Sequence, residues 1–340
     1  MNMQACHQLT QTNGITELAY LGAKPWHGLG QSIREGASVE EMQAAAGMYW
    51  RIERATVQFS TPDMDPILQL PRMQPHSVKD RVVLYRSDNL LPLGVVSERY
   101  NEVQPSEALE FFRDMTEAGG YVLESAGTMM GGSRLFAAVK TAQGFDLPGG
   151  DEVVGRLLFA TACDGSMSTT IGQISLRVVC RNTLNAALGG MPARVHVRHS
   201  TKFDAAKAKM ELRKISTSFD AFARAAETLA KAQASAQSAG DFLHALLPTP
   251  SNGANVEDTR GYKTIMRLFD GEGQGAQLAS ARGTKWGLLN AVTQYVDHEA
   301  RARSADTRQD SALFGVGATL KSRADHTYRV YASQGTATAT

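Results

Sequence analysis

The chain has 340 residues, of which 43% are hydrophobic and 20% are charged, and its formal net charge is +1. These proportions are typical of a packed protein and exclude a chain that is disordered throughout, while the small net charge excludes an acidic nucleic-acid mimic and a histone-like polycation. Three cysteines without a CxxC pair exclude a disulfide framework and a cysteine-rich zinc site.

The first predicted elements are short helices and a hairpin. Ser38 and Glu41 have the spacing of a capping box and predict a helix directly after them. Residues 80–100 predict a hairpin, because two apolar segments flank a polar turn at 87–89. Residues 106–117 predict a helix, with Pro105 near its first turn and a glycine at 119 that ends it.

Four strands are predicted next, at 121–127, 134–140, 153–163 and 169–180, separated by short turns. The last strand leads into the stretch RNTLNAALGG, where Asn182 is placed to cap a helix over 183–188. The glycines that follow are typical of a helix end.

A long helix is predicted from 201 to about 238, opened by a capping box of Thr201 and Asp204. One apolar face is expected to support contacts between copies of the chain, through Ile215, Phe219 and Phe222. The same face continues through further residues at helical spacing, namely Leu212, Ala226 and Leu229.

The pattern as a whole predicts an α+β fold: an antiparallel β-meander sheet flanked by helices, then a long helix and a small helical C-terminal segment. Four parts are expected. They are an N-terminal segment with a Trp-His-Gly loop and a short helix (1–80), an α+β core (81–240), a helical segment (241–330) and a disordered tail (331–340). No apolar run approaches the roughly 20 residues of a membrane span or forms a signal peptide, so a cytoplasmic protein without a membrane partner is expected.

The stretch SLRVVCRN raises the question of whether Cys180 is a nucleophile. Successive side chains of a strand point to opposite faces, and Cys180 shares an entirely apolar face. We therefore interpret it as a core residue; Cys163, at a strand end, has no better claim to reactivity. Arg177 and Arg181 lie on the polar face, and the alternatives for them are binding phosphate or pairing with carboxylates.

Residues 192–214 carry the one strong local excess of positive charge in the chain. Such a cluster is the signature of a surface for a polyanion, although a solvated helix face explains the lysines at 207 and 209 equally well. The predicted nucleic-acid-binding residues are Arg177, Arg181, Asn182, Arg194, Arg198, Lys202, Arg213 and Lys214.

Other signals point to chemistry only weakly. Two Asp-His pairs, at 297–298 and 325–326, together with His27 suggest a metal or acid–base site, but no HxxxH or HExxH spacing supports it. The glycine-rich stretch at 270–275 lacks the lysine and hydroxyl of a phosphate loop, so no ATP hydrolysis and no cofactor are expected. Three aromatic residues are candidates for base stacking or for core positions: Trp26, Tyr100 and Trp286.

The stretches KPWHGLG, YNEVQPSEALEFF, DGSMSTTIGQISLRVVCRNTLNAAL and GTKWGLLNAVTQYVDH resemble the family called domain of unknown function 932, the phage/plasmid-like proteins. The resemblance runs from about Pro25 to His298. It implies a protein of a mobile genetic element in a bacterial cytoplasm.

A remoter resemblance, in element order only, is to the single-strand annealing proteins of recombination. It implies DNA held in a basic groove beside the sheet and subunits assembled into a ring or filament. The favoured hypothesis is therefore a homo-oligomeric protein that binds and anneals single-stranded DNA without ATP hydrolysis and is not an enzyme. The alternatives are a metal-dependent hydrolase or nuclease and a non-enzymatic regulator that binds a host protein.

Overall fold

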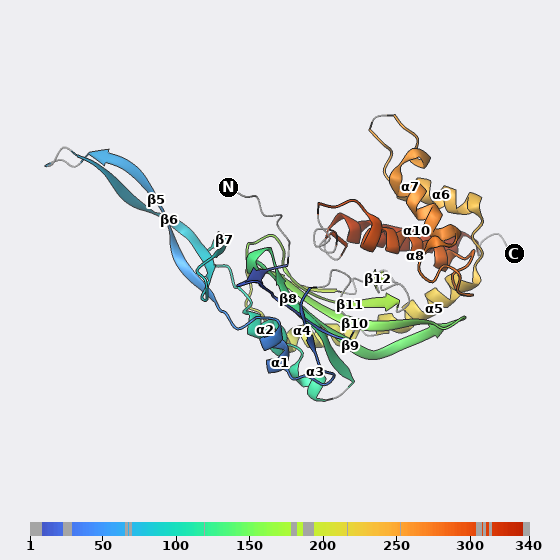
Figure 1. Cartoon of the computed structure of the whole chain (residues 1–340), viewed down its shortest axis with the longest axis horizontal. Helices are drawn as coiled ribbons and strands as arrows, with labels where there is room; N and C mark the ends of the chain where they lie inside the picture. The colour runs from blue at the N-terminus through green and yellow to red at the C-terminus, as the bar shows by residue number, and fades with distance from the viewer. Residues whose placement is uncertain are drawn as a thin grey trace. The chain divides into compact units, whose positions relative to one another are not determined.

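The structure is a computed structural model of the whole chain (Figure 1). It describes the backbone of residues 9–22, 29–64, 67, 70–118, 120–177, 182–185, 194–215, 217–251, 253–303, 308, 311–312 and 315–335. Within these ranges, the side chains at 175–177, 182–185, 213–215, 217–218 and 329–335 are not described.

An eight-stranded sheet is the main β element, and its strand order is β12-β11-β10-β9-β8-β3-β4, with β13 paired to β11. The strands β8 to β12 follow one another in the chain, as the predicted meander requires. The bounds are β3 (Leu18–Leu21), β4 (Gln31–Ile33), β8 (Tyr121–Met129), β9 (Arg134–Leu147), β10 (Asp151–Ala162), β11 (Thr169–Arg177), β12 (Asn182–Asn185) and β13 (Arg194–Val197). A small separate pair is formed by β1 (Gln11–Thr12) and β2 (Ile15–Thr16).

The helix predicted after Asn182 is wrong where the structure describes it. Asn182 is the first residue of β12, which pairs antiparallel with β11 through Arg177↔Asn182 and Ile174↔Asn185. Pairing with a neighbouring strand satisfies the backbone donors that the asparagine would have capped, so tertiary contact overrides the local signal. Residues 186–193 lie outside the described part of the chain.

A three-stranded sheet stands apart from the main sheet and contains a long hairpin. It has the order β5 (Ile52–Met64), β6 (Pro71–Arg86) and β7 (Pro92–Ser97). The hairpin of β6 and β7 confirms the turn predicted at 87–89. Figure 1 shows β5 and β6 as a narrow ribbon that extends from the α1, α2 and β8 region, and the sequence did not predict β5.

Three short helices accompany the N-terminal half: α1 (Val39–Ala45), α2 (Pro105–Glu110) and α3 (Arg113–Glu117). The capping box before α1 is confirmed, because the Ser38 side chain accepts a hydrogen bond from the Glu41 amide and the Glu41 carboxylate accepts one from the Ser38 amide. The single helix predicted over 106–117 is interrupted at 111–112, where Phe111 and Phe112 are buried.

The long helix predicted over 201–238 is wrong, because the segment contains separate helices. The Asp204 carboxylate accepts a hydrogen bond from the Lys207 amide and so caps the first of them. The chain leaves helical geometry after Lys231, where the amide of Ala234 donates to the carbonyl of Gly283. The helices of this half are α4 (Ala205–Ile215), α5 (Thr217–Lys231), α6 (Ala236–Leu246), α7 (Arg260–Arg267), α8 (Lys285–Gln294) and α10 (Val316–Gly335).

Two π-helical turns follow α7 and α8 directly: η3 (Leu268–Glu272) and η4 (Tyr295–Glu299). Single 3-10 turns occur at η1 (Met130–Gly132) and η2 (Val256–Asp258). α10 continues through residues 331–335, which the sequence assigned to a disordered tail. No helix in the described part of the chain has the length and apolarity that crossing a membrane requires.

The chain forms two compact units. Unit 1 comprises 1–139, 158–171 and 196–208, and unit 2 comprises 140–157, 172–195 and 209–340. In unit 1 an aromatic cluster of Phe111, Phe112, Phe159 and Phe203 joins α2, β10 and the segment before α4. The mixed helices and antiparallel strands confirm the predicted α+β class.

The apolar face predicted on residues 212–229 is used inside unit 2. Phe219 and Phe222 are 3% and 1% exposed and pack with Ala226, Leu229 and Trp286 in one core. A face that is buried within its own unit cannot also contact a second copy, so the oligomer contact predicted for Phe219 and Phe222 is wrong. The side chain of Ile215 is not described.

Candidate nucleic-acid interface

The eight residues predicted to bind nucleic acid lie on several elements. Arg177 ends β11, Asn182 begins β12, and Arg194 begins β13. Arg198 and Lys202 lie between β13 and α4, with exposed side chains. Arg213 and Lys214 lie in α4, but their side chains, like that of Arg177, are not described; Arg181 lies outside the described residues altogether.

Arg194 differs from its neighbours because it is half-buried. Burial lowers the pKa of Arg194, since a low-dielectric surrounding disfavours the charged guanidinium. Arg194 also makes an interaction within the chain. Arg194 belongs to unit 2, whereas Arg198 and Lys202 belong to unit 1. Because Arg194 is half-buried, only Arg198 and Lys202 of these three are exposed cations.

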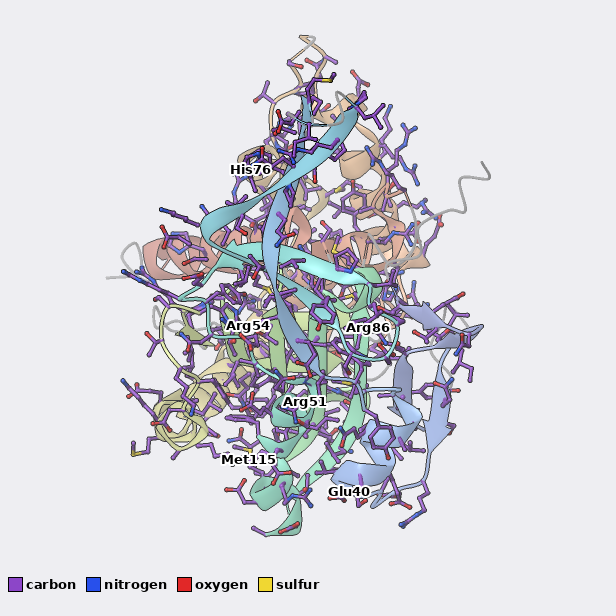
Figure 2. The ribbon with its side chains drawn as sticks, turned by 90° about the vertical axis from the view of Figure 1, so that its left-hand side faces the viewer. Glu40, Arg51, Arg54, His76, Arg86 and Met115 are labelled. Atoms are coloured by element: carbon purple, nitrogen blue, oxygen red, sulfur yellow. The ribbon has the colours of Figure 1, made fainter. Side chains whose placement is uncertain are left out.

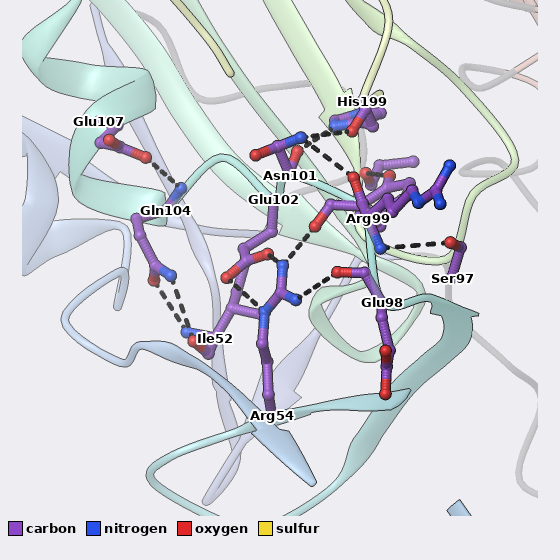
Figure 3. Close-up of polar contacts among 12 residues, drawn as sticks. Ile52, Arg54, Ser97, Glu98, Arg99, Asn101, Glu102, Gln104, Glu107 and His199 are labelled. Carbon is purple, nitrogen blue, oxygen red and sulfur yellow. Dashed lines mark hydrogen bonds and ion pairs between the residues drawn. The ribbon is translucent and has the colours of Figure 1, made fainter. Parts of the chain in front are cut away.

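A polar lock fixes the loop that carries Arg198 and Lys202. The carbonyl oxygen of His199 accepts hydrogen bonds from the Asn101 backbone amide at 2.6 Å and from the Asn101 side chain at 3.1 Å (Figure 3). In return, the His199 ring donates from Nδ1 to the carbonyl of Asn101 at 2.7 Å. Two loops that are about a hundred residues apart in sequence are thus joined side by side.

Tyr100 packs against the histidine ring and is itself held in place. The rings of Tyr100 and His199 are stacked, with centroids 4.4 Å apart and planes inclined by 17°. The Tyr100 hydroxyl donates to the carbonyl of Ala162 at 2.7 Å, and burial raises the pKa of that hydroxyl. Because both ends of Tyr100 are engaged, it is a structural residue of the lock and not a platform for bases. Trp286 is fully buried, and Trp26 lies outside the described residues.

The lock joins the loop of Arg198 and Lys202 to a loop that carries a third cation, which the sequence did not predict. Arg99 lies two residues before Asn101 and has an exposed side chain (Figure 3). None of the side chains of Arg99, Arg198 and Lys202 forms an ion pair with any residue that the structure describes. We call these three residues the cation triad. Nothing local in sequence marks Arg99, because it joins the other two only through the contact of Asn101 with His199.

Two of the acidic side chains on these two loops already bind other groups of the chain. The Glu102 carboxylate pairs with Arg54 on β5, and the Nη1 of Arg54 also donates to the carbonyl of Glu98 at 3.2 Å (Figure 3). The Asp204 carboxylate caps α4. Glu98 is exposed and adjoins the cation triad; its charge opposes that of Arg99.

The base of the β5–β6 ribbon is anchored beside this site. The Gln104 side chain makes two hydrogen bonds to the backbone of Ile52, accepting from its amide at 2.9 Å and donating to its carbonyl at 3.1 Å (Figure 3). The side-chain amide thereby forms the two hydrogen bonds that a neighbouring strand would otherwise form with this residue. Together with the Arg54–Glu102 pair, it fixes the start of β5 against the loop that carries Arg99.

A buried group of charges holds the end of β6. Arg86 is fully buried and binds two carboxylates, Glu17 at 2.6 and 3.1 Å and Asp88 at 2.8 and 2.9 Å. Its guanidinium lies 4.2 Å from the ring centroid of Trp50. The Thr128 hydroxyl donates to Glu17 as well. Burial would lower the pKa of Arg86, but hydrogen bonds to Asp88 and Glu17 outweigh it and raise that pKa.

The Asp-His pairs do not form a metal site in the part of the chain that is described. Asp297 is buried in η4 and accepts a hydrogen bond from the Lys321 ammonium at 2.7 Å. Among the described residues, no group of three or more histidine, cysteine or acidic side chains is placed to hold a metal ion. His27 lies outside that part of the chain.

The Cys163 thiol is expected to be unreactive in the folded protein. It is 1% exposed, and burial raises its pKa, so the thiolate is scarcer than that of a free cysteine. In the variant Cys6→Ser/Cys180→Ser, alkylation of Cys163 at about pH 8.5 is expected to be at least about 100-fold slower than in denaturant. Comparable rates in the two conditions would contradict the burial of this thiol. Cys180 lies outside the described residues.

Unit 1 is therefore an α+β assembly in which a polar lock presents the cation triad. The family model for domain of unknown function 932 matches residues 92–313, which is more than half of the chain. The chain belongs to this family. The match includes the lock and the cation triad and begins after the β5–β6 ribbon. No curated protein and no solved structure matches the chain.

Proposed function

We propose that the chain binds single-stranded nucleic acid through its phosphates and promotes the pairing of complementary strands, as a protein of a mobile genetic element in the bacterial cytoplasm. The observation that carries the proposal is the cation triad. Arg99, Arg198 and Lys202 are exposed, form no ion pair with any described residue and are held on two loops by the His199–Asn101 lock. Fixed guanidinium and ammonium groups suit the successive phosphates of a polyanion.

The character of the interface favours contacts with the backbone over contacts with bases. Tyr100 and Trp286 are engaged within the fold, so neither supplies the aromatic platform on which bases stack. Contacts with phosphates alone leave the base edges free. A strand held in this way remains able to pair with its complement, which is what annealing requires, and no nucleotide hydrolysis is needed.

A metal-dependent hydrolase is the weaker alternative. Asp297, one of the residues on which it depended, already neutralises Lys321 in a buried pair. A carboxylate in that position is a structural counter-ion, and no second observation favours this function.

The proposal is tested by fluorescence anisotropy with labelled oligonucleotides of one length: single-stranded DNA, duplex DNA and single-stranded RNA. We expect the single strands to bind at least about tenfold more tightly than the duplex, because a flexible backbone adapts to cations fixed on two loops. Heparin, a polyanion without bases, is the control for binding by negative charge alone. Equal affinity for duplex and single strands, or no binding at low salt, would overturn the proposal.

A further inference from the structure

The distal half of the β5–β6 ribbon has two unlike faces. A bulge separates it from the base: Thr56 pairs with Val82, but the next pair is Gln58 with Ser77. Beyond the bulge, residues 58–64 pair with 71–77 over about 20–24 Å, and most of these side chains are exposed. Figure 2 shows His76 on this distal half, far from Arg54 and Arg86 at the base.

One face of the distal ribbon is polar and internally paired. Phe59 stacks on His76 with ring centroids 5.2 Å apart, and the Thr61 hydroxyl lies 2.9 Å from His76 Nε2. Asp63 and Arg72 form a cross-strand ion pair at 3.0 Å. Each of these side chains therefore has a partner on its own face.

The opposite face is uncharged, and toward the tip of the ribbon it is apolar. Cross-strand partners share a face, and the alternate pairs of the register are Gln58↔Ser77, Ser60↔Pro75, Pro62↔Met73 and Met64↔Pro71. Met64 is 51% exposed and Met73 62% exposed, and the three prolines are exposed as well. We call this surface the Pro/Met face.

The same prolines block the edges of the ribbon. Proline has no N–H, so it fits a two-stranded ladder only where the backbone group points away from the partner strand. Pro62, Pro71 and Pro75 occupy such outward positions and remove donors that an added strand would need. The prolines therefore disfavour the addition of a strand at either edge, and a partner that packs on the face of the ribbon is favoured.

We propose that the Pro/Met face packs against the Pro/Met face of a second copy of this chain. A two-stranded ribbon is marginally stable in water, whereas two ribbons packed face to face cover each other's apolar side chains. The face has no charged residue, so identical copies meet without repulsion, and the Asp63–Arg72 pairs point outward. A two-fold arrangement matches each patch to itself.

The Pro/Met face is small for a protein–protein interface. Packing two such faces buries on the order of 800–1,000 Å², less than the roughly 1,200–2,000 Å² of a standard stable interface. The dimer is therefore expected to be weak and to form only at high protein concentration. The contact is independent of the proposed binding of nucleic acid, since it involves no residue of the cation triad.

Sedimentation velocity on the full chain, from about 1 to about 200 µM, tests the proposal. We expect the wild type to pass from monomer to dimer and Met73→Glu to weaken the dimer at least about tenfold, because it places two like charges in a desolvated contact. Gln74→Glu adds the same charge at the next residue, on the opposite face, and is expected to change the dissociation constant less than about twofold. Circular dichroism confirms that both variants are folded.

Cross-linking gives a second readout that does not depend on the weak equilibrium. In the background Cys6→Ser/Cys180→Ser, Met73→Cys is expected to form disulfide-linked dimers under mild oxidation, and Gln74→Cys is expected to remain monomeric. A wild type that stays monomeric at the highest concentration, or equal effects of the substitutions at 73 and 74, would overturn the proposal.

Discussion

Replacing Arg86 with methionine is expected to lower the free energy of unfolding by about 3–5 kcal/mol, because it leaves a buried carboxylate without its counter-ion. Arg86 is fully buried and neutralises Glu17, which is 3% exposed and has no other cation beside it among the described ion pairs. Among the described residues, the substitution leaves the buried Glu17 carboxylate with hydroxyl donors from Thr12 and Thr128 only. Urea denaturation followed by circular dichroism measures the change.

Two further variants serve as controls for Arg86→Met. Arg72→Met removes an arginine from an exposed ion pair with Asp63 and is expected to cost at most about 1 kcal/mol. The double variant Arg86→Met/Glu17→Gln removes both buried charges and is expected to recover part of the loss, because the one carboxylate that then lacks its arginine, Asp88, is exposed to solvent. An Arg86→Met protein as stable as the wild type would show that the buried pair does not hold the ribbon to the sheet.

Reversing the charge of two triad residues, in Arg198→Glu/Lys202→Glu, is expected to weaken binding of a single-stranded oligonucleotide by about 100-fold at low salt. Each reversal removes one phosphate contact and adds repulsion, at about 1–1.5 kcal/mol per site. Both side chains are exposed and form no ion pair with any described residue, so the fold is expected to be unchanged. Anisotropy measures the affinity, and thermal unfolding checks the fold.

Two single substitutions test whether the loss of affinity comes from the cation triad or from the change in net charge. Lys79 is an exposed lysine on the ribbon of the same unit, and Lys79→Glu is expected to change the affinity less than about threefold. Glu98→Gln removes the exposed acid beside Arg99 and is expected to tighten binding about two- to threefold. If Lys79→Glu weakened binding as much as the double reversal, the effect would come from net charge and not from the triad.

Much of the fold follows from local patterns in the sequence. The four strands of the meander have apolar segments bounded by turns, and the helix after Ser38 has a reciprocal cap. β5 has no such pattern, since both faces of its distal half are exposed and no alternation is imposed by a core. Pro62 weakens the strand signal further, because prolines in strands are confined to edges.

The candidate site was only half predictable for a related reason. Arg198 and Lys202 stand out as part of a charge cluster in the sequence, whereas Arg99 is a single arginine in a segment that also carries acids. It becomes part of a site through the contacts of Asn101 with His199, which join distant segments and leave no local trace. The cap predicted at Asn182 was wrong because β11 offered its backbone a better partner.

The salt dependence of binding tests the central claim most directly. Three phosphate contacts on a single strand predict a log–log slope of affinity against salt of about −2, since each contributes about −0.7. The neutral variant Arg198→Gln/Lys202→Gln is expected to have a slope shallower by about 1.4. Equal slopes for the wild type and this variant would contradict the account, because the triad would then contact no phosphate.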